Sequence, residues 1–304
     1  MNRGTEQRSS IPVSLRIAAG SLAVSIAVLA IKFGAYLLTG SVALYSDAME
    51  SIINVLTAAA AIVAIRSAAR PPDAEHPYGH DKAEYLSAVM VGTLIVVAGL
   101  AILWEAYGAV LAPKPIDAPW TGVAVNAMAT VINAVWSRVL LRQGRKHRSA
   151  ALVADGKHLL ADVITSLGVV VGVAVAVLTG IDVLDAAIAV LVALHVLRSG
   201  WDVIRENASG LLDESVPAEE LARIREVISR DAGEAIEIHD LRTRHAGRTI
   251  FIDFHLVVPG SMSVEQSHEI CDRLEAALQK AFDGAVVMIH VEPEHEAKQA
   301  SAIV

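Results

Sequence analysis

The chain has 304 residues, of which 54% are hydrophobic and 19% charged, and its formal net charge is −8. Soluble domains average about 25% charged residues, so the composition argues against an ordinary soluble protein and favours a membrane protein. The only cysteine, Cys271, excludes an intrachain disulfide framework. Residues 209–304 hold 9 Lys/Arg and 18 Asp/Glu, whereas residues 1–208 hold 16 and 15. An acidic C-terminal domain of this kind suits cations and is a poor partner for nucleic acid.

Apolar segments follow one another through the first two thirds of the chain, each of about 20 residues or more and therefore able to cross a bilayer as a helix. They are residues 15–38, 42–65, 86–111, 121–141, 150–178 and 183–204. The polar N-terminus has no cleavage site of small residues, so we expect no signal peptide and interpret residues 1–10 as a cytoplasmic tail. The sequence predicts a six-helix transmembrane domain over residues 11–208.

Basic residues mark one side of the predicted membrane domain. Arg and Lys cluster before the first segment, after the second and after the fourth, whereas the opposite loops hold only Lys114. Because cytoplasmic loops carry the excess of Lys and Arg, the pattern predicts that both termini are cytoplasmic.

Two of the apolar segments carry polar side chains at helical spacing. Asp47, Glu50 and Asn54 stand at i, i+3 and i+7 in the second segment, and His158 and Asp162 stand at i and i+4 in the fifth. Ionisable groups inside a membrane are costly, so they are candidates for function. Two such stripes facing each other would form a cation site of imidazole and oxygen ligands. The alternative is that these residues form interhelical hydrogen bonds or face a cytoplasmic vestibule.

The loop between the second and third segments contains a His-x-x-x-His pattern beside an acidic residue. Asp73, His76 and His80 have a spacing compatible with a tetrahedral metal site, with a Pro-Tyr-Gly turn between the imidazoles. Exposed loop histidines are common, so the pattern alone also fits a solvated loop.

The pattern changes after residue 215, where apolar positions recur first at helical and then at strand spacing. The predicted elements are a helix over 217–231, strands over 236–247 and 248–260, a helix over 263–282 and a strand over 285–295. This order predicts a compact α-β-β-α-β domain over residues 209–295, followed by a flexible tail, residues 296–304.

This soluble domain holds six of the eleven histidines of the chain. His239, His255 and His290 each lie on a predicted strand, Glu292 follows the third of them, and His268 lies on the predicted helix. Three strands of one sheet can bring such side chains together. A solvated surface explains one or two of these histidines, but the set predicts a metal site.

Together these stretches resemble the cation diffusion facilitator family of metal/proton antiporters. The resemblance covers nearly all of the chain and rests on TGSVALYSDAMES, RPPDAEHPYGHDKAEYLSA, ADGKHLLAD, IHDLRTR and MIHVEPE. It implies a homodimeric transporter of the bacterial inner membrane, not an enzyme, whose cytoplasmic α+β domain has a metallochaperone-like fold.

The resemblance also implies roles for the candidate residues. The transport site would combine His158 and Asp162 with Glu50 and Asn54. The family more often has aspartate or histidine at the position of Glu50, and aspartate at the position of Asn54. Asp47 would be a further candidate. Two more metal sites are implied: a loop site of Asp73, His76 and His80, and a cytoplasmic binuclear site of His239, His255, His268, His290 and Glu292. Lys82 and Asp213 match a charge interlock that holds the dimer at the membrane surface.

The expected function is proton-coupled efflux of a divalent transition-metal cation from the cytoplasm. Metal ligands must be deprotonated, so metal and proton compete for such a site. Zn²⁺ is favoured on the resemblance, with Fe²⁺, Mn²⁺, Co²⁺ and Cd²⁺ as alternatives. A metal-gated cation channel is the alternative function. A membrane metallohydrolase would need an acid/base motif such as H-E-x-x-H, which the sequence lacks.

Overall fold

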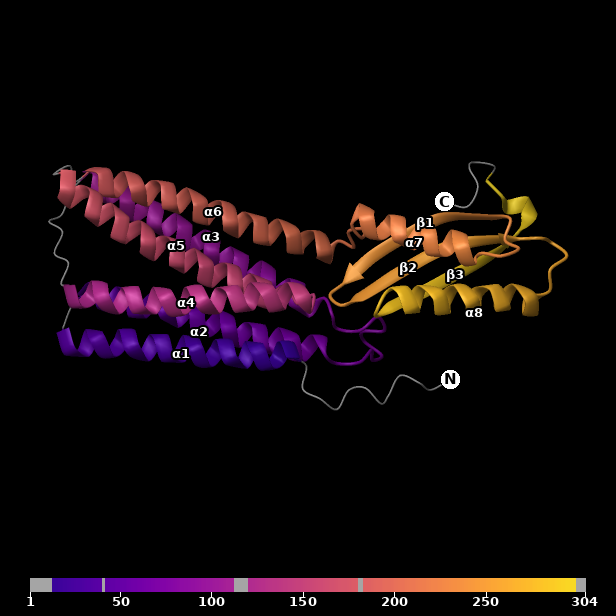
Figure 1. The fold of residues 1–304 in the computed structure, drawn as a ribbon, viewed down its shortest axis with the longest axis horizontal. Coiled ribbons are helices and arrows are strands. Elements are labelled where there is room, and N and C mark those ends of the chain that lie inside the picture. Colours follow the sequence, from indigo (N-terminus) through magenta and orange to yellow (C-terminus); the bar gives the residue numbers. More distant parts are fainter. Residues whose placement is uncertain (1–12, 40–41, 112–119, 180–182, 299–304) are drawn as a thin grey trace. The chain divides into compact units, whose positions relative to one another are not determined.

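In the computed structural model, residues 13–39, 42–111, 120–179 and 183–298 are described, and the chain divides into two compact units, residues 1–208 and 209–304. The first unit is helical in its described residues (Figure 1). Its helices are α1 (Val13–Thr39), α2 (Val42–Ala68), α3 (Ala83–Leu111), α4 (Trp120–Lys146), α5 (Ala150–Thr179) and α6 (Val183–Leu211). Each of the six predicted segments lies within one of these helices, although α4 and α6 extend beyond their predicted ends at 141 and 204.

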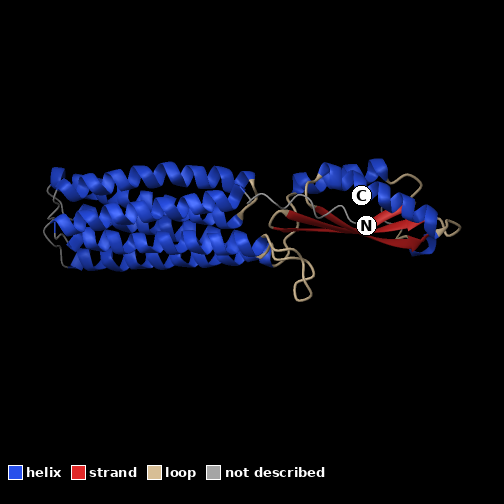
Figure 2. Cartoon of the chain, turned by 90° about the horizontal axis from the view of Figure 1, so that it is seen from below, coloured by secondary structure: helices blue, strands red, loops and turns tan. Residues whose placement is uncertain are grey.

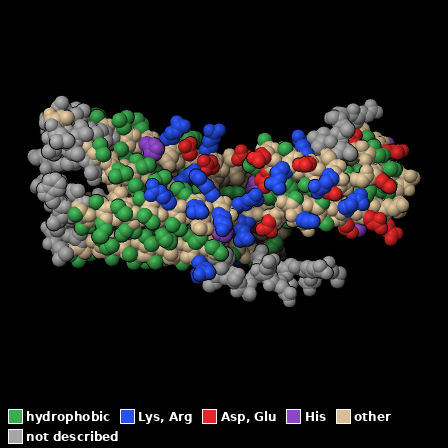
Figure 3. Space-filling view, viewed as in Figure 1, with side chains coloured by type: hydrophobic (Ala, Val, Ile, Leu, Met, Phe, Trp, Pro, Cys, Tyr) green, Lys and Arg blue, Asp and Glu red, His purple; other side chains and the backbone are tan. Residues whose placement is uncertain are grey.

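The helices of the first unit are apolar on their outer faces as well as between them. Leu37, Val63, Trp104 and Leu191 are among the large hydrophobic side chains that remain exposed. A helix that is hydrophobic all round requires an apolar surrounding, which a bilayer supplies. Figure 3 shows this hydrophobic surface, with Lys and Arg gathered toward one end of the unit. The predicted membrane helical domain is confirmed.

Length and hydropathy identify membrane spans most clearly in the first three helices. Among the described residues, the stretches Val13–Gly34, Ser51–Ala68 and Ala83–Gly108 are long and apolar enough to cross a membrane.

Close packing of α4 against α5 involves glycine: a Cβ at Gly156 would lie 3.0 Å from Leu140 Cβ, and one at Gly144 would lie 2.8 Å from Val153 Cγ2. Small residues of this kind let membrane helices approach closely, which fixes the position of α5.

The second unit contains helices and a three-stranded sheet in the predicted α-β-β-α-β order. Its elements are α7 (Ala218–Asp231), β1 (Glu237–Ala246), β2 (Thr249–Val258), α8 (Val264–Ala281), β3 (Ala285–Pro293) and the short 3₁₀ turn η1 (Glu294–Glu296). The sheet order is β1-β2-β3, with β1 antiparallel and β3 parallel to β2. Gly247, with a φ of 57°, makes the predicted turn between β1 and β2.

Both helices of the second unit cover the same face of the sheet (Figure 2). Ile250, Ile252, Phe254 and Leu256 of β2 are buried in one core with side chains of α7 and α8. Side chains alternate between the two faces of a strand, so His255 projects from the opposite face. The sequence of β2 thus places Asp253 and His255 on the face opposite the hydrophobic core.

Candidate metal sites

Helices α2 and α5 pack against each other, and each carries a candidate polar residue that is buried in the helical unit. Asn54 and His158 are each only 3% exposed, and Asp162 is half-buried. The side-chain oxygen of Asn54 is buried without a hydrogen-bond partner in the described part of the chain. The side chains of Asp47 and Glu50 lie outside the described residues. Asn54 thus presents an oxygen that a cation could bind.

A buried carboxylate one turn before His158 joins three helices. Asp155 of α5 is 1% exposed, and its Oδ2 accepts a hydrogen bond from Ser21 Oγ of α1 at 2.6 Å. The Thr57 hydroxyl of α2 lies 3.2 Å from Asp155 Oδ1 and 3.1 Å from the main-chain oxygen of Asn54, and shares its proton between them. Buried polar groups need such partners. Asp155 therefore sets the position of α5 relative to α1 and α2, and its partners have no signal in the sequence pattern.

A second carboxylate fixes the start of α5. Glu84, in the first turn of α3, accepts hydrogen bonds from Ser149 Oγ at 2.5 Å and from the Ala151 N–H at 3.3 Å. The first N–H groups of a helix have no partner within the helix and favour a negative charge. Glu84, on the neighbouring helix α3, supplies both a hydrogen-bond acceptor and a negative charge to the start of α5. Helix α5 is therefore held at its N-terminal end as well as at Asp155.

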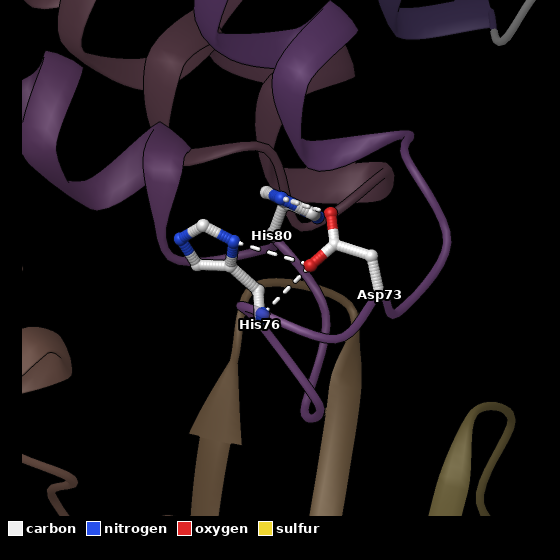
Figure 4. Close-up of side chains that lie close together, drawn as sticks. All are labelled: Asp73, His76 and His80. Carbon is white, nitrogen blue, oxygen red and sulfur yellow. Dashed lines mark hydrogen bonds and ion pairs between the residues drawn. The ribbon is translucent and has the colours of Figure 1, made fainter.

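The loop between α2 and α3 brings Asp73, His76 and His80 together (Figure 4). Asp73 Oδ1 lies 3.4 Å from His76 Nδ1, and Asp73 Oδ2 lies 3.4 Å from His80 Nε2. The two imidazole centroids are 4.3 Å apart. Ligands that are each about 2.0–2.1 Å from a tetrahedral Zn²⁺ lie about 3.3 Å from one another. The three side chains are therefore spaced as ligands of one ion would be.

Asp73 also builds the turn that carries the histidines. Its Oδ1 accepts hydrogen bonds from the backbone N–H groups of His76, at 2.7 Å, and Glu75, at 3.0 Å. The bond from His76 holds the pKa of the Asp73 carboxyl below its ordinary value. A depressed pKa means that this carboxylate supports the turn at neutral pH and loses that role only when the pH falls through the lowered pKa.

Replacing Asp73 by asparagine separates its role in the turn from its proposed role as a metal ligand. An amide oxygen accepts the same backbone hydrogen bonds but carries no charge. We expect Asp73→Asn to keep the turn and to weaken Zn²⁺ binding in the loop about tenfold, whereas Asp73→Ala loses both. Protection of His80 from diethyl pyrocarbonate by Zn²⁺ measures binding, and hydrogen exchange at the Glu75 and His76 amides measures the turn. Equal Zn²⁺ protection in Asp73→Asn and wild type would contradict a ligand role.

The second unit places three histidines in one row across its sheet. His239 of β1 pairs with His255 of β2, and His255 pairs with His290 of β3. The imidazole centroids are 5.2 Å apart for the first pair and 4.9 Å for the second. This register, which the sequence does not contain, turns three separate strand histidines into one cluster.

Glu292 is the acidic partner of this row. Its carboxylate oxygens lie 3.2 Å from His239 Nε2, 2.8 Å from His255 Nδ1 and 3.7 Å from His290 Nε2. Both nitrogens of His239 are buried and make no hydrogen bond among the described residues, although each lies within 3.2 Å of a carboxylate oxygen. Nitrogen and oxygen atoms that approach one another without hydrogen-bond geometry suit a shared cation.

Two further carboxylates adjoin the row and were not predicted from the sequence. Glu237 Oε1 lies 3.1 Å from His239 Nδ1. Asp240 offers an oxygen within 4.8 Å of the ligand atoms of His239 and His255. Adjacent residues of a regular strand point to opposite faces, but a β-bulge begins after His239 and Asp240 has a φ of 52°. The bulge therefore brings Asp240 to the face of the histidines.

The remaining candidates are His268 and the two residues of the expected charge interlock. His268 is exposed on α8, with its Nε2 3.7 Å from Asp272 Oδ1, and no described contact joins it to the histidine row. Asp213 pairs with Arg244 of the same unit at 3.0 Å. Its expected partner, Lys82, belongs to the other unit, so the charge interlock stays a prediction.

With the fold and these clusters established, the molecule is a membrane protein with cation-ligand side chains in its bundle, a loop and a soluble domain. Comparison with family models matches residues 19–212 to the cation efflux transmembrane domain and residues 216–294 to the cation efflux protein cytoplasmic domain. The chain belongs to the cation efflux family, the cation diffusion facilitators. It is accordingly a cation efflux transporter and not an enzyme, and the family does not favour the channel alternative.

Individual relatives cover nearly the whole chain. The uncharacterized transporter sll1263 of Synechocystis sp. is 41% identical over 278 residues, 91% of this chain and 90% of that protein. The cation-efflux pump FieF of Serratia proteamaculans is 32% identical over 290 residues, 94% of each chain. Among solved structures, the metal-bound C-terminal domain of the CzcD transporter from Thermotoga maritima is 30% identical, covers 27% of this chain and 100% of that one, and has a TM-score of 0.25.

Proposed function

We propose that the protein exports a divalent transition-metal cation, with Zn²⁺ as the principal substrate, from the cytoplasm across the bacterial inner membrane in exchange for protons. The observation that carries this proposal is the burial of polar candidate ligands on two helices, α2 and α5, that pack against each other. Asn54 and His158 are each only 3% exposed, on helices whose outer faces are largely apolar. Polar groups are retained at such positions mainly for function.

The proposed transport site consists of His158 and Asp162 on α5 and of Asn54, Glu50 and Asp47 on α2. One imidazole with several oxygen donors suits Zn²⁺, and it also suits Fe²⁺, Mn²⁺, Co²⁺ and Cd²⁺. Asp155 and Glu84 support the site by fixing α5 in two places. Because α5 carries two of the proposed ligands, its position determines the distance between the two halves of the site.

Proton coupling follows from the chemistry of these ligands. An imidazole or a carboxylate must lose its proton before it binds a metal, so a metal that enters displaces protons and a proton that returns releases the metal. Exposure of the site first to the cytoplasm and then to the far side would convert this competition into export driven by the proton gradient. The gathering of Lys and Arg at one end of the helical unit supports a cytoplasmic location for that end and for both termini (Figure 3).

The soluble domain is the proposed regulatory part of a homodimer. His239, His255, His290 and Glu292 would bind metal there, with His268 as a further ligand, and Asp73, His76 and His80 would form the loop site. The match of residues 216–294 to the cytoplasmic domain model supports this role. The proposed interlock between Lys82 and Asp213 would hold the two protomers together near the membrane.

Reconstitution in liposomes tests the exchange directly. With a pH-sensitive dye inside the vesicles, addition of Zn²⁺ is expected to produce metal uptake together with outward movement of protons. Protein-free vesicles are the control, and competition among Zn²⁺, Fe²⁺, Mn²⁺, Co²⁺ and Cd²⁺ orders the substrates. Metal uptake without any proton movement would contradict antiport and would favour a channel.

A further inference from the structure

After β3, the chain returns to the cluster of histidines and places the ammonium group of a lysine beside it. Lys298 lies just beyond η1, and its ammonium Nζ is 2.7 Å from Asp240 Oδ2. The backbone N–H of the same residue donates to Glu237 Oε1 at 3.3 Å. We call these two contacts the Lys298 clasp. They lie on either side of His239 in the sequence, at the two carboxylates that adjoin its imidazole.

The clasp uses groups that the metal cluster also offers. Asp240 supplies one of three ligand atoms, with His239 and His255, that lie within 4.8 Å of one another. Glu237 Oε1 is shared between the Lys298 N–H and His239 Nδ1. A lysine ammonium has three donors and no lone pair, so it satisfies a carboxylate in the manner of a cation but cannot ligate a metal. An ammonium and a divalent ion at one carboxylate repel each other.

The backbone of β1 shows that this arrangement is specified locally. Asp240 stands in the left-handed region, and the β-bulge that follows His239 directs the Asp240 carboxylate to the histidine face. Asp and Asn adopt this conformation more readily than other residues with a side chain. A regular strand would direct Asp240 away from His239, and neither the shared ligand geometry nor the clasp would form.

From these contacts we infer that Lys298 is an internal competitor for metal at the cytoplasmic site, and that the metal must displace its ammonium from Asp240. This inference rests on the proposed metal binding by His239, His255 and Glu292. The Lys298 and Asp240 side chains are partly exposed, so the ammonium can leave into water when the ion arrives. Lys298 thereby sets the metal concentration at which the domain responds, and metal binding frees the segment after β3.

The test measures the occupancy of the cytoplasmic site by Zn²⁺ in the full-length chain. Diethyl pyrocarbonate modifies imidazole nitrogens that are not bound to metal, so protection of His255, followed by mass spectrometry, reports occupancy. Lys298→Met removes the ammonium but keeps an apolar stem, and it is expected to lower the Zn²⁺ concentration for half-protection about tenfold, as for a site that is competent about one tenth of the time. Lys280→Met, which removes an exposed lysine of α8, is the matched control and leaves the midpoint unchanged.

A double variant and a second readout make the inference falsifiable. In an Asp240→Asn background, Lys298→Met is expected to leave the Zn²⁺ concentration for half-protection unchanged, because the carboxylate for which the ammonium and the metal compete is gone. Zn²⁺ is also expected to increase acylation of Lys298 by an amine reagent relative to Lys280. If the Zn²⁺ concentration for half-protection of His255 in Lys298→Met is within twofold of the wild-type value, the competition by Lys298 is refuted and the proposed cytoplasmic site is not. If Zn²⁺ fails to protect His255 in the wild-type chain, the proposed cytoplasmic site fails, and the clasp with it.

Discussion

Replacing Asp162 by alanine is expected to abolish metal transport while the protein stays folded. Asp162 is half-buried on α5, one turn after His158, and offers the only carboxylate of the proposed site whose side chain is among the described residues. Loss of residues that merely orient a metal ligand typically costs 10- to 100-fold, so loss of a ligand should lower the transport rate by more than about 100-fold. Zn²⁺ uptake by proteoliposomes measures this rate, and gel filtration in detergent checks folding and assembly.

Thr165 provides the matched control on the same helix. Its hydroxyl donates to the main-chain oxygen of Asp162 at 2.8 Å and so makes a helix-internal hydrogen bond beside the proposed ligand. Thr165→Val removes that bond and keeps the shape of the side chain. We expect it to transport at close to the wild-type rate. Wild-type transport in Asp162→Ala would refute the assigned site, and equal losses in both variants would indicate a structural effect on α5.

Replacing Glu292 by alanine is expected to weaken Zn²⁺ binding by the soluble domain about 100-fold. Its carboxylate is the one group within 3.7 Å of His239, His255 and His290 together among the described residues. Glu292 supplies a negative charge to all three imidazoles, whereas Glu237 and Asp240 adjoin only the part of the row at His239 and His255. Calorimetric titration of residues 209–304 with Zn²⁺ measures the effect, since this unit has its own hydrophobic core.

Two further variants separate charge from general disturbance. Glu292→Gln keeps a similar shape but removes the charge, so its affinity should fall between those of wild type and Glu292→Ala. His295→Ala removes an exposed histidine three residues away and should bind Zn²⁺ as wild type does. If Glu292→Ala keeps wild-type affinity, the histidine row does not hold the metal through this carboxylate.

The order of the helices and strands follows directly from the spacing of apolar residues. Long apolar runs define α1 to α6 because a bilayer requires continuous apolar length. In the second unit, Ile252, Phe254 and Leu256 alternate with Asp253 and His255 in an apolar, β-branched stretch, which predicts a strand. The positions of His239, His255 and His290 on strands follow from the same alternation.

The contacts between elements do not follow from spacing. Ser21 and Thr57 have no distinctive pattern in the sequence, but they become the partners of Asp155 once α1, α2 and α5 pack together. In the sequence, Glu84 is an ordinary acidic residue in the first turn of α3, and only the structure shows the start of α5 beside it. Hydrogen bonds of this kind join residues 65 to 134 positions apart, so only the packed helices reveal them.

The sequence by itself determined the class of protein, the elements and the side chains able to bind a cation, because each depends on composition and local periodicity. Tertiary structure decided which of those side chains share a site. The register of β1, β2 and β3 aligned His239, His255 and His290 in one row. The bulge at Asp240 broke the regular alternation of side chains along β1, and the segment after β3 brought Lys298 to that carboxylate. Both depend on hydrogen bonds between distant segments, which a local pattern cannot specify.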